Sequence, residues 1–101
     1  MPRPATLDDI PALLAIERQC FATDRLSRRS FRHLLTRGNA VTLLDEADGR
    51  IRGYVLLLFS RGTSMARLYS IAVRPECGRH GVGNRLLEEA ERAALERDCV
   101  S

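Results

Sequence analysis

The sequence contains no tryptophan, and its aromatic rings are limited to two tyrosines and three phenylalanines. Proteins that bind nucleic acids commonly combine exposed aromatic rings with a concentrated basic patch. Here the sixteen basic residues, all arginines, are interspersed with thirteen acidic residues, and the net charge is only +3. We therefore expect a mixed, solvated surface and no nucleic-acid partner, while the slight basic excess would suit an anionic cofactor.

Cysteine is scarce, and long hydrophobic runs are absent. Cys20, Cys77 and Cys99 form an odd set without C-x-x-C spacing, so neither a disulfide framework nor a zinc site is expected. The longest apolar run, residues 54–59, is far shorter than the roughly 20 residues of a membrane-spanning helix. Met1 is followed by no apolar signal core. We expect a cytoplasmic protein with reduced thiols, no metal and no membrane partner.

Length and hydrophobic patterning predict a single domain over residues 1–101. The chain is 45% hydrophobic, which is ordinary for a globular fold and sufficient for a modest core. The periodicity predicts the order strand, helix, helix, strand, strand, strand, helix. The expected strands are 3–5, 40–46, 51–60 and 65–73, and the expected helices are 8–20, 27–37 and 82–96.

The two N-terminal helices carry start signals. Thr6 followed by Asp9 resembles a capping box, and Pro11 falls in the first turn, where its missing N–H is harmless. Ser27 is the expected N-cap of the second helix, and Gly38 is its expected C′ residue. The side chains expected to face the core are Ile10, Leu13, Leu14, Cys20 and Phe21 in the first helix and Phe31, Leu34 and Leu35 in the second.

The next three strands are expected to form an antiparallel meander. Asp48 and Gly49 stand between two apolar runs, which is a strong signal for a tight hairpin turn. Gly53 predicts a bulge or a close backbone approach. Asp98 is expected to close the last helix. The residues that this helix should bury are Val82, Leu86, Leu87, Ala90, Ala93 and Ala94.

Three glycines, Gly78, Gly81 and Gly83, lie where the last strand passes into the last helix. Main-chain N–H groups at a helix start attract anions, and glycines let a diphosphate approach them closely. A Walker A motif would need Lys-Ser/Thr where Asn84 and Arg85 stand, and the dinucleotide-binding fingerprint would need a third glycine. On the residues alone, a tight turn and an anion site both remain open.

The segment SIAVRPECGRHGVGNRLL, residues 70–87, resembles the acetyl-coenzyme A motif of the GNAT N-acetyltransferases. That motif is Arg/Gln-x-x-Gly-x-Gly/Ala after an apolar strand and a Val-x-Pro step. Gly81 and Gly83 fill its glycine positions, and the flanks are matched by Val73, Pro75, Leu86 and Leu87. One departure is Gly78, which occupies the Arg/Gln position. The next residue, Arg79, matches the arginine of the branch that acetylates the N-terminal alanine of a ribosomal protein, so the resemblance implies that Arg79 serves the phosphates.

The resemblance implies an α/β (α+β) fold with a mostly antiparallel sheet, the GNAT-like acyl-CoA N-acyltransferase fold. It spans the whole chain but only the first two thirds of the family's domain. We therefore expect the domain to be truncated at the start of its fifth strand. The fourth strand would then have an unpaired apolar edge, so we expect either a homodimer through that edge or a chain that is part of a longer protein.

The implied activity is transfer of an acetyl group from acetyl-CoA to a primary amine, with a peptide or protein N-terminus as the favoured acceptor. The alternative is a non-catalytic half-domain that binds coenzyme A or a partner chain. In the family, the first two helices border the acceptor cleft, so residues 21–29 are the implied substrate-facing segment; a solvated arginine-rich face is the other interpretation. The implied cofactor-binding residues are Ile71, Ala72, Val73, Arg79, His80, Gly81, Val82, Gly83 and Asn84.

The sequence identifies no catalytic residue. Some relatives place a glutamate on the fourth strand as the base, but residues 65–73 contain no carboxylate, and Arg67 stands near that position. The tyrosine acid of many relatives comes from a later helix. Tyr69 is interpreted as a packing residue and His33 as a surface or packing residue.

Overall fold

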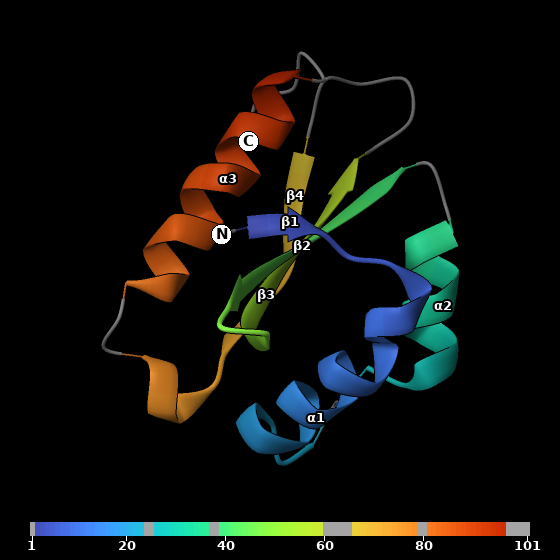
Figure 1. The fold of residues 1–101 in the computed structure, drawn as a ribbon. Helices are drawn as coiled ribbons and strands as arrows, with labels where there is room; N and C mark the ends of the chain where they lie inside the picture. Colours follow the sequence, from blue (N-terminus) through green and yellow to red (C-terminus); the bar gives the residue numbers. More distant parts are fainter. Residues whose placement is uncertain (1, 24–25, 37–38, 60–65, 79–80, 97–101) are drawn as a thin grey trace.

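The protein forms a four-stranded antiparallel sheet in the order β1-β2-β3-β4, with helices on both faces. The computed structural model describes residues 2–23, 26–36, 39–59, 66–78 and 81–96. In Figure 1, α3 lies on one side of the sheet, and α1 and α2 lie on the other. The elements are β1 Pro2–Pro4, the 3-10 helix η1 Leu7–Asp9, α1 Ile10–Cys20, α2 Arg28–Thr36, β2 Ala40–Ala47, β3 Arg50–Phe59, β4 Ala66–Val73, the 3-10 helix η2 Pro75–Cys77 and α3 Val82–Glu96.

The predicted order of elements is confirmed, with ends that differ by one or two residues. Asp48 and Gly49 both have positive φ, 54° and 76°, as a tight hairpin turn between β2 and β3 requires. The predictions for Gly38, Met65 and residues 97–101 lie outside the described residues.

Gly53 shows both features predicted for it. A Cβ at this position would lie 2.7 Å from the Ala72 carbonyl oxygen, so only glycine allows β3 and β4 to pair this closely. The register with β2 also shifts here, because Asp45 pairs with Gly53 whereas Glu46 pairs with Ile51. The residue between them is therefore bulged out of the ladder.

Successive side chains of each strand point to opposite faces of the sheet, so each face contributes side chains to a separate layer of the core. One core cluster joins α3 to Leu43, Val55 and Leu57. The other joins α1 and α2 to Leu44, Tyr54 and Leu56. The two layers of core therefore divide the molecule into an α3 side and an α1–α2 side.

The helices bury half of the predicted side chains, and six others are partly buried against the core: Leu14, Cys20, Phe21, Leu34, Leu35 and Ala93. Ile10, Leu13 and Phe31 are buried on the α1–α2 side. On α3, Val82, Leu86, Ala90 and Ala94 follow a four-residue spacing and are buried. The prediction for Leu87 is wrong, since its side chain is 39% exposed. Leu86 already occupies the core-facing line, and the next residue lies about 100° around the helix.

Side-chain hydrogen bonds fix the starts of the N-terminal helices. The Thr6 N–H donates to the Asp9 carboxylate at 2.8 Å, in the predicted capping arrangement. Arg3 adds two bonds to the same carboxylate, at 3.0 and 2.9 Å. The Ser30 N–H donates to Ser27 Oγ at 3.1 Å, which confirms Ser27 as the cap of α2. Within the described part of the chain, no helix has the length and apolar character needed to cross a membrane.

Candidate functional site

The start of α3 presents main-chain N–H groups that the helix itself does not use. The Arg85 N–H donates to the Gly81 carbonyl at 3.1 Å, so Gly81 is the residue that caps the helix. The N–H groups of Val82, Gly83 and Asn84 therefore precede the first intrahelical bond, at the positive end of the helix dipole. This arrangement can accept an anion.

The two motif glycines contribute in different ways. Gly81 has a φ of 68°, which a side chain strongly disfavours, so the backbone itself requires glycine there. Gly83 lies in helical conformation, and an added Cβ would meet only Val73 Cγ2, at 3.8 Å. Gly83 is therefore not needed for packing, and its missing side chain leaves the first turn of α3 open to a ligand. The same contact places the end of β4 beside that turn.

β4 is an outer strand of the described sheet. The Arg74 N–H donates to the Arg52 carbonyl at 2.8 Å, so this N–H and, by alternation, the peptide groups of Ala72 point toward β3. Those of Ile71 and Val73 point to the outer edge. The Cys20 thiol confirms this direction, since it donates to the Val73 carbonyl at 3.3 Å. Of the three predicted β4 residues, Ile71 and Val73 offer main-chain groups at that edge, whereas Ala72 is paired within the sheet.

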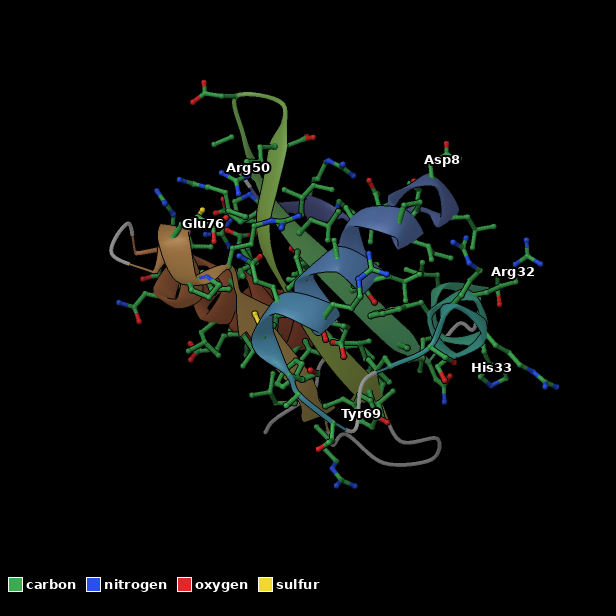
Figure 2. All side chains as sticks on the ribbon, turned by 90° about the horizontal axis from the view of Figure 1, so that it is seen from below. Asp8, Arg32, His33, Arg50, Tyr69 and Glu76 are labelled. Atoms are coloured by element: carbon green, nitrogen blue, oxygen red, sulfur yellow. The ribbon has the colours of Figure 1, made fainter. Side chains whose placement is uncertain are left out.

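A bulge interrupts β4 next to this edge. Leu56 pairs with Ser70 and Leu57 pairs with Leu68, which leaves Tyr69 as the extra residue. Tyr69 is 48% exposed and lies at the rim of the molecule in Figure 2. The interpretation of Tyr69 as a packing residue is therefore wrong, because the bulge turns its side chain out of both core layers.

A buried polar chain crosses the α1–α2 side and ends at Ser70. Glu17 on α1 is 2% exposed, and Tyr54 on β3 is fully buried. The Tyr54 hydroxyl makes a short hydrogen bond to Glu17 Oε1 and lies 2.9 Å from Ser70 Oγ. The second Glu17 oxygen accepts the Leu26 N–H at 2.8 Å. The chain thus connects the segment between α1 and α2 with β4.

The direction of these hydrogen bonds follows from their chemistry. Burial, followed by the hydrogen bond from Tyr54 to Glu17, raises the Tyr54 pKa well above its ordinary value, so the phenol stays protonated. Its single proton is directed to Glu17, and the Ser70 hydroxyl therefore donates to the Tyr54 oxygen. Ser70 Oγ keeps its lone pairs for a further donor. Burial also raises the pKa of the Cys20 thiol.

Sequence reasoning missed Glu17, although the sequence contained a signal for it. Glu17 continues the apolar stripe of α1, four residues after Leu13 and three before Cys20. A charged residue on a core-facing stripe must be paired when the helix docks. The partner, Tyr54, is 37 residues away in the chain, so only the fold identifies it.

A second buried carboxylate links α3 to the sheet. Asp45 on β2 has no exposed side-chain surface and lies 2.8 Å from Nε of Arg52. Arg85, in the first turns of α3, approaches the other carboxylate oxygen at 3.6 Å. This network holds the start of α3 against β2 and β3, so the N–H groups have a fixed position relative to β4.

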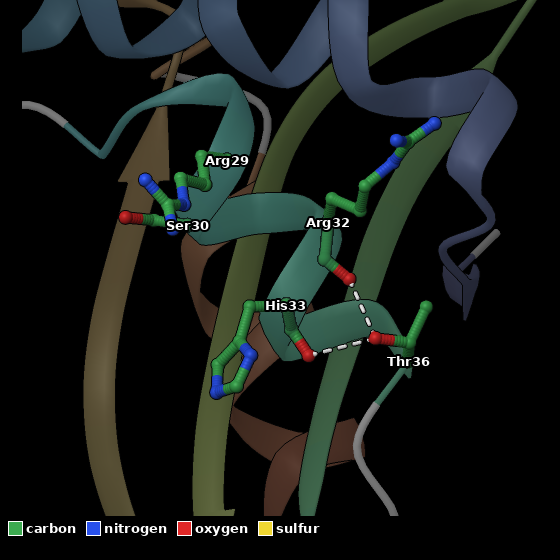
Figure 3. Close-up of a pocket in the computed structure, with 5 residues that line it drawn as sticks. All are labelled: Arg29, Ser30, Arg32, His33 and Thr36. Carbon is green, nitrogen blue, oxygen red and sulfur yellow. Dashed lines mark hydrogen bonds between the residues drawn. The ribbon is translucent and has the colours of Figure 1, made fainter.

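The outer face of α2 forms an open hollow on the other side of the sheet. Its volume is about 450 Å³, and its walls come from a single helix (Figure 3). The lining residues are Arg29, Ser30, Arg32, His33 and Thr36. His33 is exposed, which is the surface alternative of the two predicted for it.

Comparison with known proteins identifies the family. The Acetyltransferase (GNAT) family matches residues 10–101 of the sequence. The chain belongs to this family. No curated protein sequence matches it.

Solved structures of GNAT proteins have the same fold. The ribosomal-protein-S18-alanine N-acetyltransferase from Escherichia coli superimposes with a TM-score of 0.84 at 23% identity, covering 96% of this chain and 60% of that one. The ribosomal-protein-alanine N-acetyltransferase from Brucella melitensis gives 0.79 at 27% identity, covering 96% and 68%. The PaiA N-acetyltransferase from Thermoplasma acidophilum, in complex with coenzyme A, gives 0.85 at 19% identity, covering 97% and 73%.

These likenesses confirm the predicted fold and family. The GNAT chain studied here spans 60% of the length of the Escherichia coli structure. Among the predicted cofactor residues, Gly81, Val82, Gly83 and Asn84 start α3, and Ile71, Ala72 and Val73 end β4 beside them. Arg79 and His80 lie outside the described residues. Within the described part of the chain, no group of His, Cys, Asp and Glu side chains could hold a metal ion.

Proposed function

We propose that this chain acts as an N-acetyltransferase that moves an acetyl group from acetyl-CoA to a primary amine. The observation that carries the proposal is the set of N–H groups at the start of α3 beside the outer edge of β4. The coenzyme A complex of the PaiA acetyltransferase, which has the same fold, supports coenzyme A as the anion.

The cofactor would use two sets of main-chain groups. The pyrophosphate would bind the N–H groups from Arg79 through Asn84, with the Arg79 guanidinium adding charge. The pantetheine and acetyl end would lie along β4 like an added strand, hydrogen-bonded to Ile71 and Val73. Ala72 would hold its neighbours in place without bonding to the cofactor, since its peptide groups are hydrogen-bonded to β3.

The reaction requires the amine nitrogen to attack the thioester carbonyl carbon. A C–N bond forms and the C–S bond breaks, so the amine loses a proton and the departing thiolate gains one. Ser70 Oγ, with lone pairs left free by the Glu17–Tyr54 chain, would accept a hydrogen bond from the amine. The buried Glu17 carboxylate would stabilise the positive charge that develops on the nitrogen.

The proposed acceptor is supported by two of the similar structures, although aminoglycoside acetyltransferases have the same fold. The two structures are ribosomal-protein-alanine N-acetyltransferases, which favours a peptide or protein N-terminus in the cytoplasm as the acceptor. The alternative is a non-catalytic domain that binds coenzyme A, or that pairs with a second copy through the outer edge of β4. Release of free thiol from acetyl-CoA in the presence of mixed amines and peptides would distinguish the enzyme from this alternative.

The cofactor site is tested by titrating the chain with acetyl-CoA in a calorimeter. In Gly83→Asp, the carboxylate occupies the N–H groups while the fold is retained, because Asp suits a helix start and an added Cβ has room. We expect binding to weaken by at least about 100-fold, from lost hydrogen bonds and charge repulsion. The matched control is Leu95→Asp, which adds the same charge at a 68%-exposed position of α3 and should bind normally.

Two results would contradict the proposal. One is a folded wild-type chain that does not bind acetyl-CoA. The other is an equal loss of binding in Gly83→Asp and in the Leu95→Asp control. That result would mean that a negative charge anywhere on α3 weakens cofactor binding, and that the start of the helix has no special role.

A further inference from the structure

The outer face of α2 carries positive charge that the described part of the protein does not neutralise. α2 contains three arginines and no acidic residue. Arg28, Arg29 and Arg32 are exposed, and among the described residues none of them forms an ion pair. The arginines that do pair with carboxylates are Arg3, Arg50, Arg52, Arg85 and Arg92.

The spacing brings two of these charges close together on the helix. Arg29 lies three residues before Arg32, so the two residues are neighbours on the helix surface. Both line the hollow, and Figure 3 shows Arg29 and His33 on one side of α2 and the Arg32 side chain extending to the other side. Like charges at this spacing destabilise a helix, and a bound anion would remove that repulsion.

α2 also lies on the side of the sheet where the acceptor would enter. The Leu26 N–H, just before α2, is bonded to Glu17, and Glu17 leads through Tyr54 to Ser70. The proposed cofactor site belongs to the start of α3, on the opposite face of the sheet. A ligand on α2 would therefore lie on the face of the sheet that carries the polar chain to Ser70, where the proposed function places the amine, so we assign it to the acceptor.

We propose that the α2 hollow binds an acidic segment of the acceptor peptide. Arginine forks bind carboxylates with two parallel hydrogen bonds, and Arg29 and Arg32 offer two such forks within one turn. A nucleic acid is disfavoured because Phe31, the aromatic residue of α2, is fully buried and cannot stack on a base. A polycationic amine would be repelled. This inference rests on the proposed function insofar as the acidic segment belongs to the amine acceptor.

Fluorescence anisotropy with short labelled peptides tests the inference without requiring catalysis. The probes are an N-acetylated Glu/Gly peptide, its Gln/Gly and Arg/Gly analogues, and a labelled oligouridine. We expect the acidic peptide to bind tightest and its affinity to fall with added salt. Arg29→Ala/Arg32→Ala should weaken its binding about tenfold, since charge-assisted hydrogen bonds are lost.

The matched control is Arg18→Ala/Arg92→Ala, which removes the same charge from exposed positions on α1 and α3. This control should weaken binding of the acidic peptide by no more than about twofold, because exposed charges at a distance are screened. Circular dichroism checks the fold, and alanine at exposed helix positions favours folding. Arg29→Gln/Arg32→Gln gives a second version of the α2 variant.

The inference is wrong if the wild-type chain does not prefer the acidic peptide, if the control loses as much binding as the α2 variant, or if oligouridine binds tighter than the peptide. Acetyl-CoA titration of the same proteins separates this inference from the proposed function. Cofactor binding should be unchanged in the α2 variant. A wild-type chain that binds the peptide but not acetyl-CoA would overturn the proposed function and leave the α2 site standing.

Discussion

The two faces of the sheet are built on different principles. On the α3 side, the buried carboxylate of Asp45 is paired with arginines, and the candidate site consists of main-chain groups at a helix start and a strand edge. On the α1–α2 side, a buried carboxylate is bonded to a phenol that also contacts a hydroxyl, and the arginines of α2 form no ion pair among the described residues. The difference agrees with our proposals that the backbone would hold the cofactor and that side chains would recognise the acceptor.

The largest effect is expected on the α3 side, where neighbouring leucines differ in burial. Leu86 is fully buried and Leu87 is 39% exposed. Leu86→Ala should lower the free energy of unfolding by about 3 kcal/mol through lost apolar burial and a cavity. Leu87→Ala should change it by less than about 0.5 kcal/mol. Urea denaturation measures both, and similar losses would mean that α3 is rotated from the orientation described.

An intermediate effect is expected on the α1–α2 side. Tyr54→Phe keeps the ring but removes the donor to Glu17, so a buried carboxylate loses one hydrogen bond. We expect a loss of about 2 kcal/mol in the free energy of unfolding. Tyr69→Phe makes the same chemical change at an exposed tyrosine and should have almost no effect. Equal effects in the two variants would disprove the buried chain.

The smallest effect is expected at the N-terminus, where it depends on pH. The hydrogen bond from Arg3 lowers the Asp9 pKa below its ordinary value of about 3.8. The resulting stabilisation is therefore present above pH 3.8 and is lost as the pH falls through the lower pKa of the folded state. Arg3→Ala should cost about 1 kcal/mol at neutral pH, since Arg3 is partly exposed, and should make the acid unfolding less steep.

Arg18→Ala, which removes an exposed arginine on α1, is the control for this measurement. Acid titration of both variants by circular dichroism should show a changed transition for Arg3→Ala alone. An unchanged acid transition in Arg3→Ala would show that the ion pair with Asp9 contributes nothing to stability.

The two sides also differ in how far the sequence predicts them. The site on the α3 side is contiguous, because β4, the glycine turn and the start of α3 lie within one stretch. Gly81, with its positive φ, marks a backbone requirement there. The order of elements was equally predictable from periodicity and from the Asp48-Gly49 turn. The resemblance to the family then assigned a cofactor to the turn.

The site on the α1–α2 side is assembled from distant residues. Glu17, Tyr54 and Ser70 meet only because α1 docks on β3 and β3 pairs with β4. The bulge that exposes Tyr69 also depends on strand register, which local patterns do not determine. Leu87 was misassigned for a simpler reason, since two adjacent apolar residues on a helix cannot both lie on the narrow stripe that faces the core.

The measurement that tests the central claim most directly is an amide chemical-shift map of the isotope-labelled chain during titration with coenzyme A. The account predicts that the largest shifts occur at the N–H groups of Gly83 and Asn84 and at Ile71 on the edge of β4, with α2 unaffected. Shifts concentrated on α2, or a folded chain whose spectrum does not change, would contradict the assignment of the cofactor to the α3 side.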